Sequence, residues 1–382
     1  MARTLSPTSE LQLAEAVAAG GPFEVRGQGS KAVLGRPLAE LPVLSLRAFD
    51  ALEIYEPEEL IFEAGAAMPL AGVQKLLAAK EQMLAFEPPD FSKLLGSRSS
   101  GTLGGLLATG LAGSRRIKAG SVRDHVLGLR GVTGRGEIFN AGARVVKNVT
   151  GYDMPKLMAG SWGTLAALTR VTFKVAPAPE TEATLAIPSA SDGDAVAAMA
   201  AALQSPCDVS GAAHVPGQGT FLRLEGIAVS VKARRDALAR LLAMKSETIA
   251  AATSRKLWRE ISNATVLPFA ANSIIWRVSV PPSDGADYLR RVTEKVEARH
   301  FLDWGGGLVW LAVAPSPDAG AAAVRGSLKH GHAMLFRAPP NVRRIVPVFQ
   351  PQPDALAALS MRVKAALDPL DKLNPGRMLE NR

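Results

Sequence analysis

Residues 101–175 constrain this chain more than any other stretch, because glycine recurs there at a density that ordinary helices and strands do not tolerate. Each glycine in a regular element costs backbone entropy and packs nothing, so this density persists where the main chain must approach a flat or charged group. The charge is equally uneven. Residues 93–174 hold thirteen Lys or Arg against three acids, whereas residues 40–90 hold ten acids against three bases. A glycine-rich cationic segment of this kind predicts a bound anionic cofactor.

Length and composition indicate a globular protein with two domains. A chain of 382 residues is long enough to bury two cores. Its first residues lack the apolar core of a secretory signal, and no apolar run approaches the ~18 residues that span a bilayer. The single cysteine, Cys207, excludes an internal disulfide framework and any cysteine-ligated zinc or iron–sulfur site within this chain. We therefore expect a cytoplasmic protein without a transmembrane segment.

The basic composition does not indicate nucleic-acid binding, although the pI is about 9.8. The sequence has no run of five or more like charges. Aromatic residues make up only 5% of the chain, so it offers few surfaces on which bases could stack. We interpret the excess charge as a basic lining that attracts a diphosphate or a carboxylate, or as a solvated surface.

The chain divides at residues 176–181, where two prolines and polar residues end a strand. We expect a first domain at 1–180, a second at 181–345, and a tail at 346–382 that returns to the first. The first helix is expected to start at Pro7 with Ser6 as its cap. In the second domain, strands alternate with amphipathic helices, which predicts an antiparallel or mixed sheet with helices on one face. This pattern includes a hairpin at 221–231.

Two common nucleotide-binding motifs are missing from the sequence. A dinucleotide fingerprint needs G-x-G-x-x-G, and here Gly27 and Gly29 are followed by Ala32 at the third position. No G-x-x-x-x-G-K-[ST] run occurs either. NAD and ATP therefore have no motif in this chain.

Four other segments carry glycine in a pattern that suits an anion. Successive main-chain N–H groups in such loops form concave anion sites, and those at a helix start near Leu103 are expected to face a phosphate. An ordinary glycine turn explains the first segment equally well and explains each of the others better, but their order and spacing together make a strong signal. The four segments are 27–31, 99–105, 120–124 and 147–165.

These segments resemble the FAD-binding domain of the vanillyl-alcohol oxidase and p-cresol methylhydroxylase (PCMH-type) family. The family pattern has a glycine loop after an early strand, then T-x-G-G, G-x-x-x-D, K-N-x-x-G-Y-D and G-S-x-G-T-L, and the chain has all five. The ending N-P-G at 374–376 matches the family's 2-hydroxy-acid dehydrogenases. The segments at 303–310 and 331–337 are similar to those of FAD-binding E subunits of bacterial glycolate oxidases. The resemblance implies an α+β fold, with a two-subdomain PCMH-type FAD-binding domain and an α+β cap domain with an antiparallel sheet.

The resemblance also implies that the cofactor is FAD. Some relatives attach the flavin through a histidine in the first glycine loop, but that loop has none here and Cys207 lies outside the domain, so we expect non-covalent FAD. The residues implied to bind it are Arg26, Gly27, Gln28, Gly29, Ser30, Thr102, Gly104, Gly105, Gly120, Ser121, Asp124, Lys147, Asn148, Gly151, Tyr152, Asp153, Gly160, Ser161, Gly163, Thr164, Asn374 and Arg377.

Oxidation of a 2-hydroxy acid requires a base for the hydroxyl proton and a cation for the carboxylate. Of the five histidines, His125 is expected to be structural, and His214 and His300 show no partner pattern. We predict His332 as the base and Arg337 as the carboxylate anchor; the alternative is that both only stabilise the second domain or an interface. No metal site is expected.

The resemblance implies a subunit of glycolate oxidase, which converts glycolate to glyoxylate and passes electrons through an iron–sulfur subunit to a membrane acceptor. The implied partners are that iron–sulfur subunit and a longer paralogous FAD subunit, with the complex at the inner face of the cytoplasmic membrane. The histidine and acid motifs of catalytic relatives are not intact here. Two alternatives stay open: a self-sufficient FAD-linked dehydrogenase of another small 2-hydroxy acid such as lactate, and an FAD-binding assembly subunit without turnover.

Overall fold

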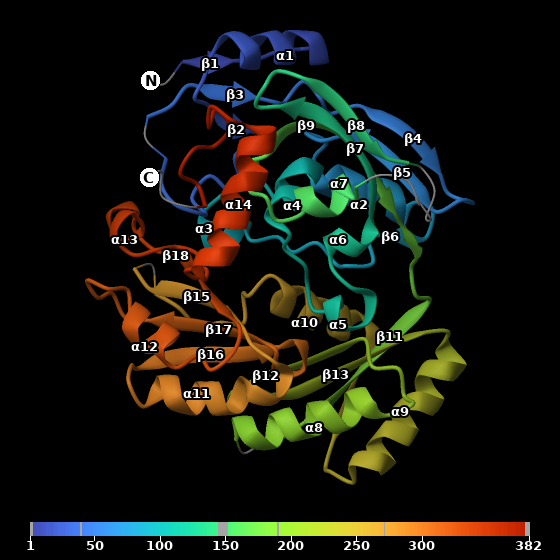
Figure 1. Cartoon of the computed structure of the whole chain (residues 1–382). Helices are drawn as coiled ribbons and strands as arrows, with labels where there is room; N and C mark the ends of the chain where they lie inside the picture. The colour runs from blue at the N-terminus through green and yellow to red at the C-terminus, as the bar shows by residue number, and fades with distance from the viewer. Residues whose placement is uncertain (1–2, 39, 144–151, 189–190, 271, 379–382) are drawn as a thin grey trace. The chain divides into compact units, whose positions relative to one another are not determined.

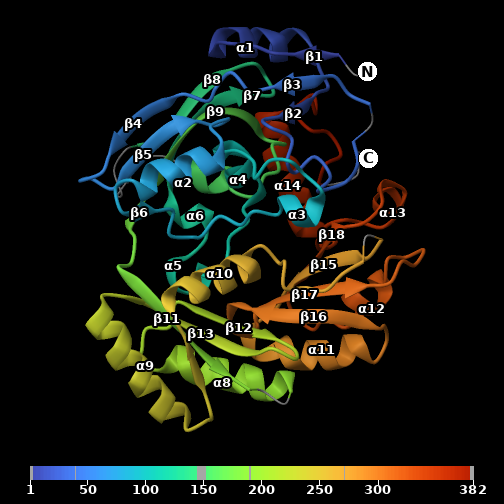
Figure 2. The same cartoon turned by 180° about the vertical axis from the view of Figure 1, so that it is seen from behind.

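The computed structural model describes residues 3–38, 40–143, 152–188, 191–270 and 272–378, which group into two compact units (Figures 1 and 2). Unit 1 comprises Met1–Leu111, Gly120–Ala178 and Pro351–Arg382; unit 2 comprises Ala112–Ala119 and Pro179–Gln350. The expected first domain at 1–180 is interrupted in the structure, because residues 112–119 belong to unit 2. That segment groups with unit 2 because the Ser114 hydroxyl donates to Asp303 at 2.7 Å, while the Ser114 amide donates to Ser262 at 3.1 Å.

Unit 1 contains two main sheets. A parallel sheet of three short strands has the order β1–β3–β2, and an antiparallel sheet of five strands has the order β4–β5–β9–β7–β8. The first contains β1 (Thr4–Leu5), β2 (Glu24–Arg26) and β3 (Val43–Ser45). The second contains β4 (Leu52–Glu56), β5 (Ile61–Gly65), β7 (Val126–Thr133), β8 (Ile138–Gly142) and β9 (Ala166–Lys174). In addition, β6 (Gln82–Met83) pairs with β10 (Ala176–Pro177).

The helices of unit 1 are short, apart from the first and the last. They are α1 (Glu10–Ala19), α2 (Leu70–Ala78), α3 (Ser92–Leu95), α4 (Leu103–Thr109), α6 (Val122–His125), α7 (Met154–Met158) and α14 (Asp354–Leu367). The expected start of α1 at Pro7 was wrong. Ser9 is the cap, because its side chain accepts a hydrogen bond from the Gln12 amide at 3.3 Å.

The tail is part of the core of unit 1. Leu373 is fully buried in one cluster with Leu13 and Val17 of α1, Phe23 before β2, and Leu44 of β3. Phe23 and Leu373 also form a parallel β-bridge. Segments about 350 residues apart in the chain are thus neighbours here, and this arrangement brings the tail to the end of β2.

Unit 2 is built on one sheet of eight strands, and every pair is antiparallel. The order is β14–β11–β13–β12–β16–β17–β15–β18. The strands are β11 (Thr181–Ile187), β12 (Gly211–Val215), β13 (Gly219–Gly226), β14 (Glu247–Ile249), β15 (Ile274–Ser279), β16 (Ala298–Asp303), β17 (Leu308–Val313) and β18 (His332–Arg337). The α+β fold with an antiparallel second sheet is therefore confirmed.

Helices lie on both faces of this sheet rather than on one (Figure 1). The helices α8, α9 and α11 cover one face, and α5 and α10 lie on the other. The expected hairpin at 221–231 was wrong: only its first half is a strand, and α9 follows from Ala228. The helices are α5 (Arg116–Ala119), α8 (Asp192–Gln204), α9 (Ala228–Leu242), α10 (Ala251–Ser262), α11 (Gly285–Thr293), α12 (Ala321–Gly326), α13 (Pro340–Ile345) and the 3₁₀ turns η1 (Pro282–Asp284) and η2 (Trp304–Gly306).

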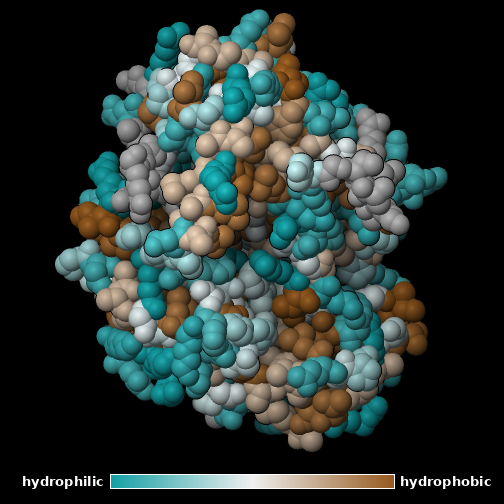
Figure 3. Space-filling model, in the orientation of Figure 1, coloured by the Kyte–Doolittle hydropathy of each residue, from teal (hydrophilic) through white to brown (hydrophobic). Residues whose placement is uncertain are grey.

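Some apolar side chains remain on the surface. No residue of α14 is buried, and Leu356, Leu359 and Met361 on this helix are each nearly half exposed. Figure 3, seen from the same side as Figure 1, shows apolar residues on this face between polar ones. Among the helices that the structure describes, none has both the length and the apolar composition needed to cross a bilayer.

Candidate cofactor pocket and substrate residues

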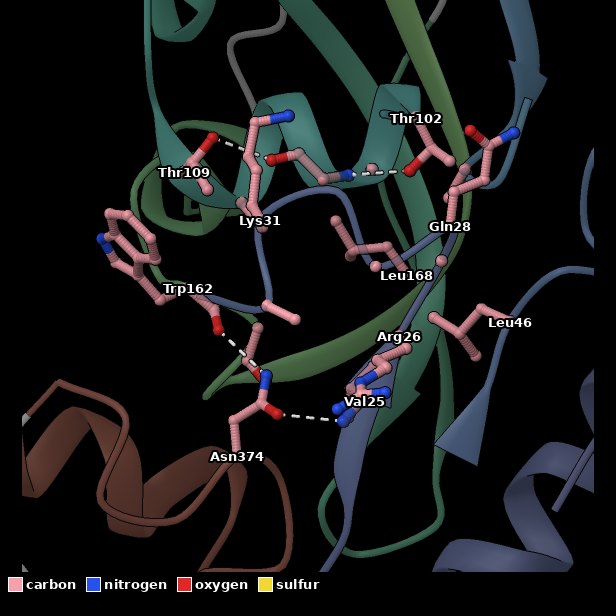
Figure 4. Close-up of a pocket in the computed structure, with 18 of the residues that line it drawn as sticks. Val25, Arg26, Gln28, Lys31, Leu46, Thr102, Thr109, Trp162, Leu168 and Asn374 are labelled. Atoms are coloured by element: carbon pink, nitrogen blue, oxygen red, sulfur yellow. Dashed lines mark hydrogen bonds between the residues drawn. The ribbon is translucent and has the colours of Figure 1, made fainter. Parts of the chain in front are cut away.

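A pocket in unit 1 lies between the end of β2, the first half of α4, the loop after α7 and the C-terminal tail (Figure 4). It collects half of the residues that the sequence analysis proposed for the cofactor. Those that line it are Arg26, Gly27, Gln28, Gly29, Ser30, Thr102, Gly104, Gly105, Gly163, Asn374 and Arg377. Four separate chain segments therefore meet at one cavity.

The first glycine loop presents unused hydrogen-bond donors. Within the described part of the chain, the backbone amides of residues 27–31 donate to no acceptor, whereas the amides of Ala32 and Leu34 bond to Gly29 and Lys31 carbonyls at 3.1 and 2.9 Å. Gly29 has a φ of +76°, a conformation that glycine adopts at little cost. Buried or half-buried amides normally find a partner. A run of unused amides beside a cavity therefore fits an anion.

Lys31 adds a positive charge to the same loop. Burial lowers the pKa of its ammonium group to about 8, although Asp90 acts in the opposite direction. Its Nζ lies 3.5 Å from the carbonyl oxygen of Ser100 and makes no other contact among the described residues. A largely desolvated ammonium group that forms no ion pair is costly until an anion binds. Lys31 lies within the glycine loop at 27–31, but no sequence pattern singles it out as a site residue.

The amides at the start of α4 are used inside the protein, contrary to expectation. Leu103 and Gly104 donate to the carbonyl oxygens of Met68 and Ala66 at 3.2 and 2.6 Å, and Gly105 donates to Thr102 Oγ1 at 3.2 Å. The glycines here instead allow close packing. A Cβ at Gly104 would lie 2.9 Å from the Cβ of Ala66, and one at Gly27 would lie 2.9 Å from Thr102 Oγ1.

Two residues of the tail hold the pocket together. Asn374 accepts from the Val25 amide at 2.9 Å and donates to the carbonyls of Trp162 and Gly163 at 3.0 and 3.2 Å (Figure 4). Arg377 donates to the carbonyls of Ala32 and Leu34 at 3.1 and 2.8 Å and pairs with buried Glu24 at 2.9 Å. Both side chains are thus bonded to protein and shape the cavity walls.

The remaining proposed cofactor residues do not line this pocket. The Ser121 amide and hydroxyl donate to Asp124 at 2.7 and 2.9 Å, and the backbone hydrogen bond holds the pKa of Asp124 below its usual range. Asp153 caps α7, and Tyr152 before it is 93% exposed. Gly120 precedes the Ser121 cap, while Gly160, Ser161 and Thr164 lie in the loop after α7. Lys147, Asn148 and Gly151 lie outside the described residues.

The pocket also has an apolar wall that the motifs did not indicate. Leu46, Ala66, Ala67 and Leu168 line it together with Trp162, whose backbone φ is +56°. Leu46 and Leu168 sit on strands or directly after them, so only the folded sheets bring them to the glycine loop. The cavity therefore offers hydrogen-bond donors at one end and an apolar surface at another, which suits a ligand with an anionic group and a flat ring.

The two residues predicted for catalysis lie at opposite ends of β18 in unit 2. His332 is exposed and pairs with Ser279, whereas Arg337 pairs with Ile275 and stacks over Phe269 at 5.1 Å. Ser279 and Ile275 are four residues apart on β15, which is about 13 Å along a strand. His330 lies before the strand and is 3.1 Å from Asp284. Within the described residues, no three His, Cys, Asp or Glu side chains group as a metal would require.

The other histidines are held by neighbours. His300 Nε2 lies 3.0 Å from both oxygens of Asp192, and His214 Nδ1 lies 3.0 Å from Thr220 Oγ1. The sequence showed no partner pattern for either residue, because Asp192 approaches them only through α8. His125 is buried, with its ring 5.4 Å from that of Phe86.

Comparison with known proteins agrees with this geometry. Residues 2–142 match the family described as an FAD binding domain. The glycolate oxidase subunit GlcE of Escherichia coli (strain K12) is 33% identical over 367 residues, which are 96% of this chain and 95% of that protein. The chain belongs to the GlcE family of glycolate oxidase subunits. FAD as the cofactor and membership of the FAD-linked oxidoreductases are thereby confirmed.

Other members of the wider group match only in part. D-2-hydroxyglutarate dehydrogenase of Xanthomonas citri pv. viticola is 38% identical over 38% of this chain and 30% of that protein, and glycolate oxidase subunit GlcD of Bacillus subtilis is 39% identical over 29% and 23%. Among solved structures, alkyldihydroxyacetonephosphate synthase has a TM-score of 0.70 at 14% identity over 97% of this chain and 75% of its own. This last likeness confirms the PCMH-type fold.

Proposed function

We propose that the chain binds FAD non-covalently in the unit 1 pocket and serves as a flavin subunit in the oxidation of glycolate to glyoxylate. The observation that carries this proposal is the loop at 27–31, whose unused amides and Lys31 face the cavity of a chain that aligns with GlcE along nearly its whole length. Among the residues that line the pocket there is no histidine, cysteine or tyrosine to which a flavin could be attached.

The residues present fit FAD in both of its parts. The amides of residues 27–31 and the Lys31 ammonium suit the diphosphate, and the apolar wall around Leu168 and Trp162 suits a planar ring. FAD, when bound, supplies the two-electron acceptor for the oxidation of an alcohol. The chain's own residues bind and orient: Glu24, Asn374 and Arg377 hold the walls at fixed distances through the hydrogen bonds described above.

We further propose that the chain works in a complex with a longer paralogous FAD subunit and an iron–sulfur subunit, in the cytoplasm or at the inner face of the cytoplasmic membrane. Cys207 is the one cysteine of the chain and is buried, so it cannot by itself hold a cluster. An iron–sulfur cluster that accepts electrons from the flavin would therefore lie on a partner. The partial likeness to GlcD supports a paralogous partner with a related FAD domain.

A role as a flavin-bearing subunit without turnover of its own is the second candidate. One observation favours it: within the described ranges, the His332 ring has no hydrogen-bond partner that would orient it as a base. If this chain turned over substrate without a partner, the His332 ring would be expected to hydrogen-bond to a carboxylate or a carbonyl that orients it.

The test is an anaerobic visible spectrum of the purified chain before and after glycolate is added. Flavin bands that bleach assign turnover to this chain. Bands that persist in the chain alone but bleach in the assembled oxidase support the second candidate. A colourless chain that takes up no added FAD contradicts the proposal.

A matched pair of variants tests whether the pocket is the FAD site. A Cβ at Gly105 would meet only Thr102 Oγ1, at 3.3 Å, so a side chain there enters the cavity with little disturbance of α4. We expect Gly105→Asp to lose FAD because it places a carboxylate beside a diphosphate, and Gly105→Asn, of the same shape but neutral, to retain more of it. Equal FAD content in the two variants would contradict the electrostatic assignment.

A further inference from the structure

Arg277 is a buried arginine without a counter-ion contact. It lies on β15 between β17 and β18, in the middle of three strands of the unit 2 sheet. Its residue is 8% exposed, and in the described part of the structure its guanidinium makes no hydrogen bond or ion pair. Its guanidinium lies 5.0 Å from the centre of the Trp304 ring and 6.0 Å from that of the Trp310 ring. Arginine is seldom buried unless it is paired.

A second arginine increases the positive charge at the same place. The guanidinium of Arg116 lies 4.5 Å from the ring of Trp304, the ring that Arg277 also contacts. Burial, followed by the charge of Arg116, lowers the pKa of Arg277 to about 10, and Asp303 offsets this only in part. The Asp303 oxygens already accept from Ser114 Oγ and from the Trp304 amide, both at 2.7 Å.

His332 lies next to Arg277 on the same face of the sheet. Arg277 pairs with Met334, and Ser279 pairs with His332. Arg277 and His332 are therefore diagonal neighbours on adjacent strands, offset by two residues along the sheet. Two residues on β15 span about 7 Å, half of the spacing that separates His332 from Arg337. Partial desolvation of its ring, followed by the charges of Arg277 and Arg116, lowers the pKa of His332. His332 remains exposed, so the group of cations is open to solvent on its side.

The backbone holds Trp304 in a strained conformation at this place. Its φ is +55°, which is unusual for a bulky residue and energetically costly. The indole Nε1 donates to the Gly113 carbonyl at 3.0 Å, and this bond fixes the ring. Strain of this kind is retained where a side chain must be held in one orientation. Here the orientation sets the ring against both arginines.

We propose that Arg277, together with Arg116 and His332, binds the carboxylate of a small 2-hydroxy monocarboxylate on unit 2. This inference rests on the proposed function for the class of its ligand. A guanidinium matches a carboxylate with two parallel N–H···O bonds, which an ammonium cannot reproduce. In a two-carbon acid the hydroxyl is on the carbon next to the carboxylate, so the base and the carboxylate anchor must be close neighbours. His332 and Arg277 meet this requirement, whereas His332 and Arg337, about 13 Å apart along the sheet, do not.

A purely structural role for Arg277 predicts a different stability from a binding role. An arginine that stabilises the fold is held by hydrogen bonds, and its removal lowers the melting temperature. A buried charge that awaits a ligand destabilises the empty protein, so its replacement by an apolar residue of similar length is neutral or stabilising. We expect the Arg277→Met variant to melt at the wild-type temperature or above it.

The experiment titrates glycolate into the FAD-loaded full chain by calorimetry and follows tryptophan fluorescence, since Trp304 and Trp310 lie against Arg277. Ethylene glycol, which has no carboxylate, and sulfate are the control ligands. We expect glycolate to bind, Arg277→Met to weaken it at least tenfold, and Arg277→Lys to restore it only in part. Arg299→Met, at an exposed arginine of the same sheet, is the matched control and should bind normally.

Two results would overturn the inference: glycolate that binds Arg277→Met as it binds the wild type, and a response to sulfate or ethylene glycol equal to that to glycolate. The proposed function fails separately. If glycolate does not reduce the flavin of the wild-type assembled oxidase while the Arg277-dependent binding persists, the binding site is supported and the proposed reaction is contradicted. If the oxidase carrying Arg277→Met turns over with an unchanged KM, the function stands and the site falls.

Discussion

The ammonium group of Lys31 links the cofactor pocket to pH. Its pKa of about 8 means that the empty protein carries this charge below pH 8 and loses it above. A bound diphosphate favours the charged form, so above pH 8 FAD must bind together with a proton. We expect the Kd for FAD to be nearly constant from pH 6.5 to 7.5 and to rise about fivefold between pH 8 and 9. Fluorescence titration of the apoprotein with FAD measures this.

The control for this prediction is a change of the same kind at a lysine outside the pocket. Lys31→Met should bind FAD more weakly by about 1.5–3 kcal/mol, the range for a hydrogen bond to a charged group, and should lose the pH dependence. Lys75→Met, on the exposed side of α2, should keep both the affinity and the pH profile. A Lys31→Met variant that retains the rise above pH 8 would assign that rise to another group.

At the scale of residues, the sequence predicted several of the backbone segments that meet at the pocket, but not how each one contributes to it. Gly27 and Gly105 can be recognised in the sequence because each belongs to a glycine motif with a fixed spacing. That the amides at Leu103 and Gly104 are satisfied by Met68 and Ala66 depends on a loop about 35 residues earlier, which no local pattern reports. Arg277 gave no signal at all, because its isolation follows from the strands on either side of it.

The C-terminal element is held in place by one lysine. Lys364 on α14 donates to the carbonyls of Thr164 and Leu373 at 2.7 and 3.1 Å and pairs with buried Asp368 at 2.5 Å. The carboxylate of Asp368 also accepts from the amides of Lys372 and Leu373. The turn that places Asn374 and Arg377 at the pocket is therefore built on this pair.

We expect Lys364→Met to destabilise unit 1 by about 3 kcal/mol, because it leaves the Asp368 carboxylate buried and unpaired. FAD affinity should fall as well, since the tail no longer holds Asn374 against Val25 and Trp162. Urea unfolding and FAD titration measure the two effects. Lys80→Met at an exposed position is the control. Unchanged FAD binding in a destabilised Lys364→Met protein would show that the tail stays in place without this pair.

Elements were predictable from the sequence where local signals acted alone. The strands around residues 274–279 and 308–313 and the helix from Leu103 follow their patterns closely. The helix start at Ser9 was missed because two serines compete for the cap and only the folded chain selects one. A hairpin was wrongly predicted at 221–231 because Ile227 and Val229 are typical strand residues, although both are exposed and lie at the start of α9.

At the scale of the whole molecule, two units with separate cores respond to different ligands. The proposed FAD pocket is lined by residues of unit 1, so FAD should raise the free energy of unfolding of that unit by about 2.7 kcal/mol at a concentration of 100 Kd. Hydrogen exchange should then slow in β7 and β9 and change little in β15 and β17. Equal protection of both sets would mean that the two units unfold as one.

The order of the segments in the chain has a consequence for how the protein is made. The hydrogen bond between Val25 and Asn374 joins residues 349 positions apart. At 5–20 residues per second, synthesis separates the appearance of the two by about 20–70 s. The glycine loop is made early, but the walls that close around it are completed only when residues 374–377 have been added. If FAD binds in this pocket as proposed, it is captured only after that delay, so free flavin is needed well after the glycine loop itself has been made.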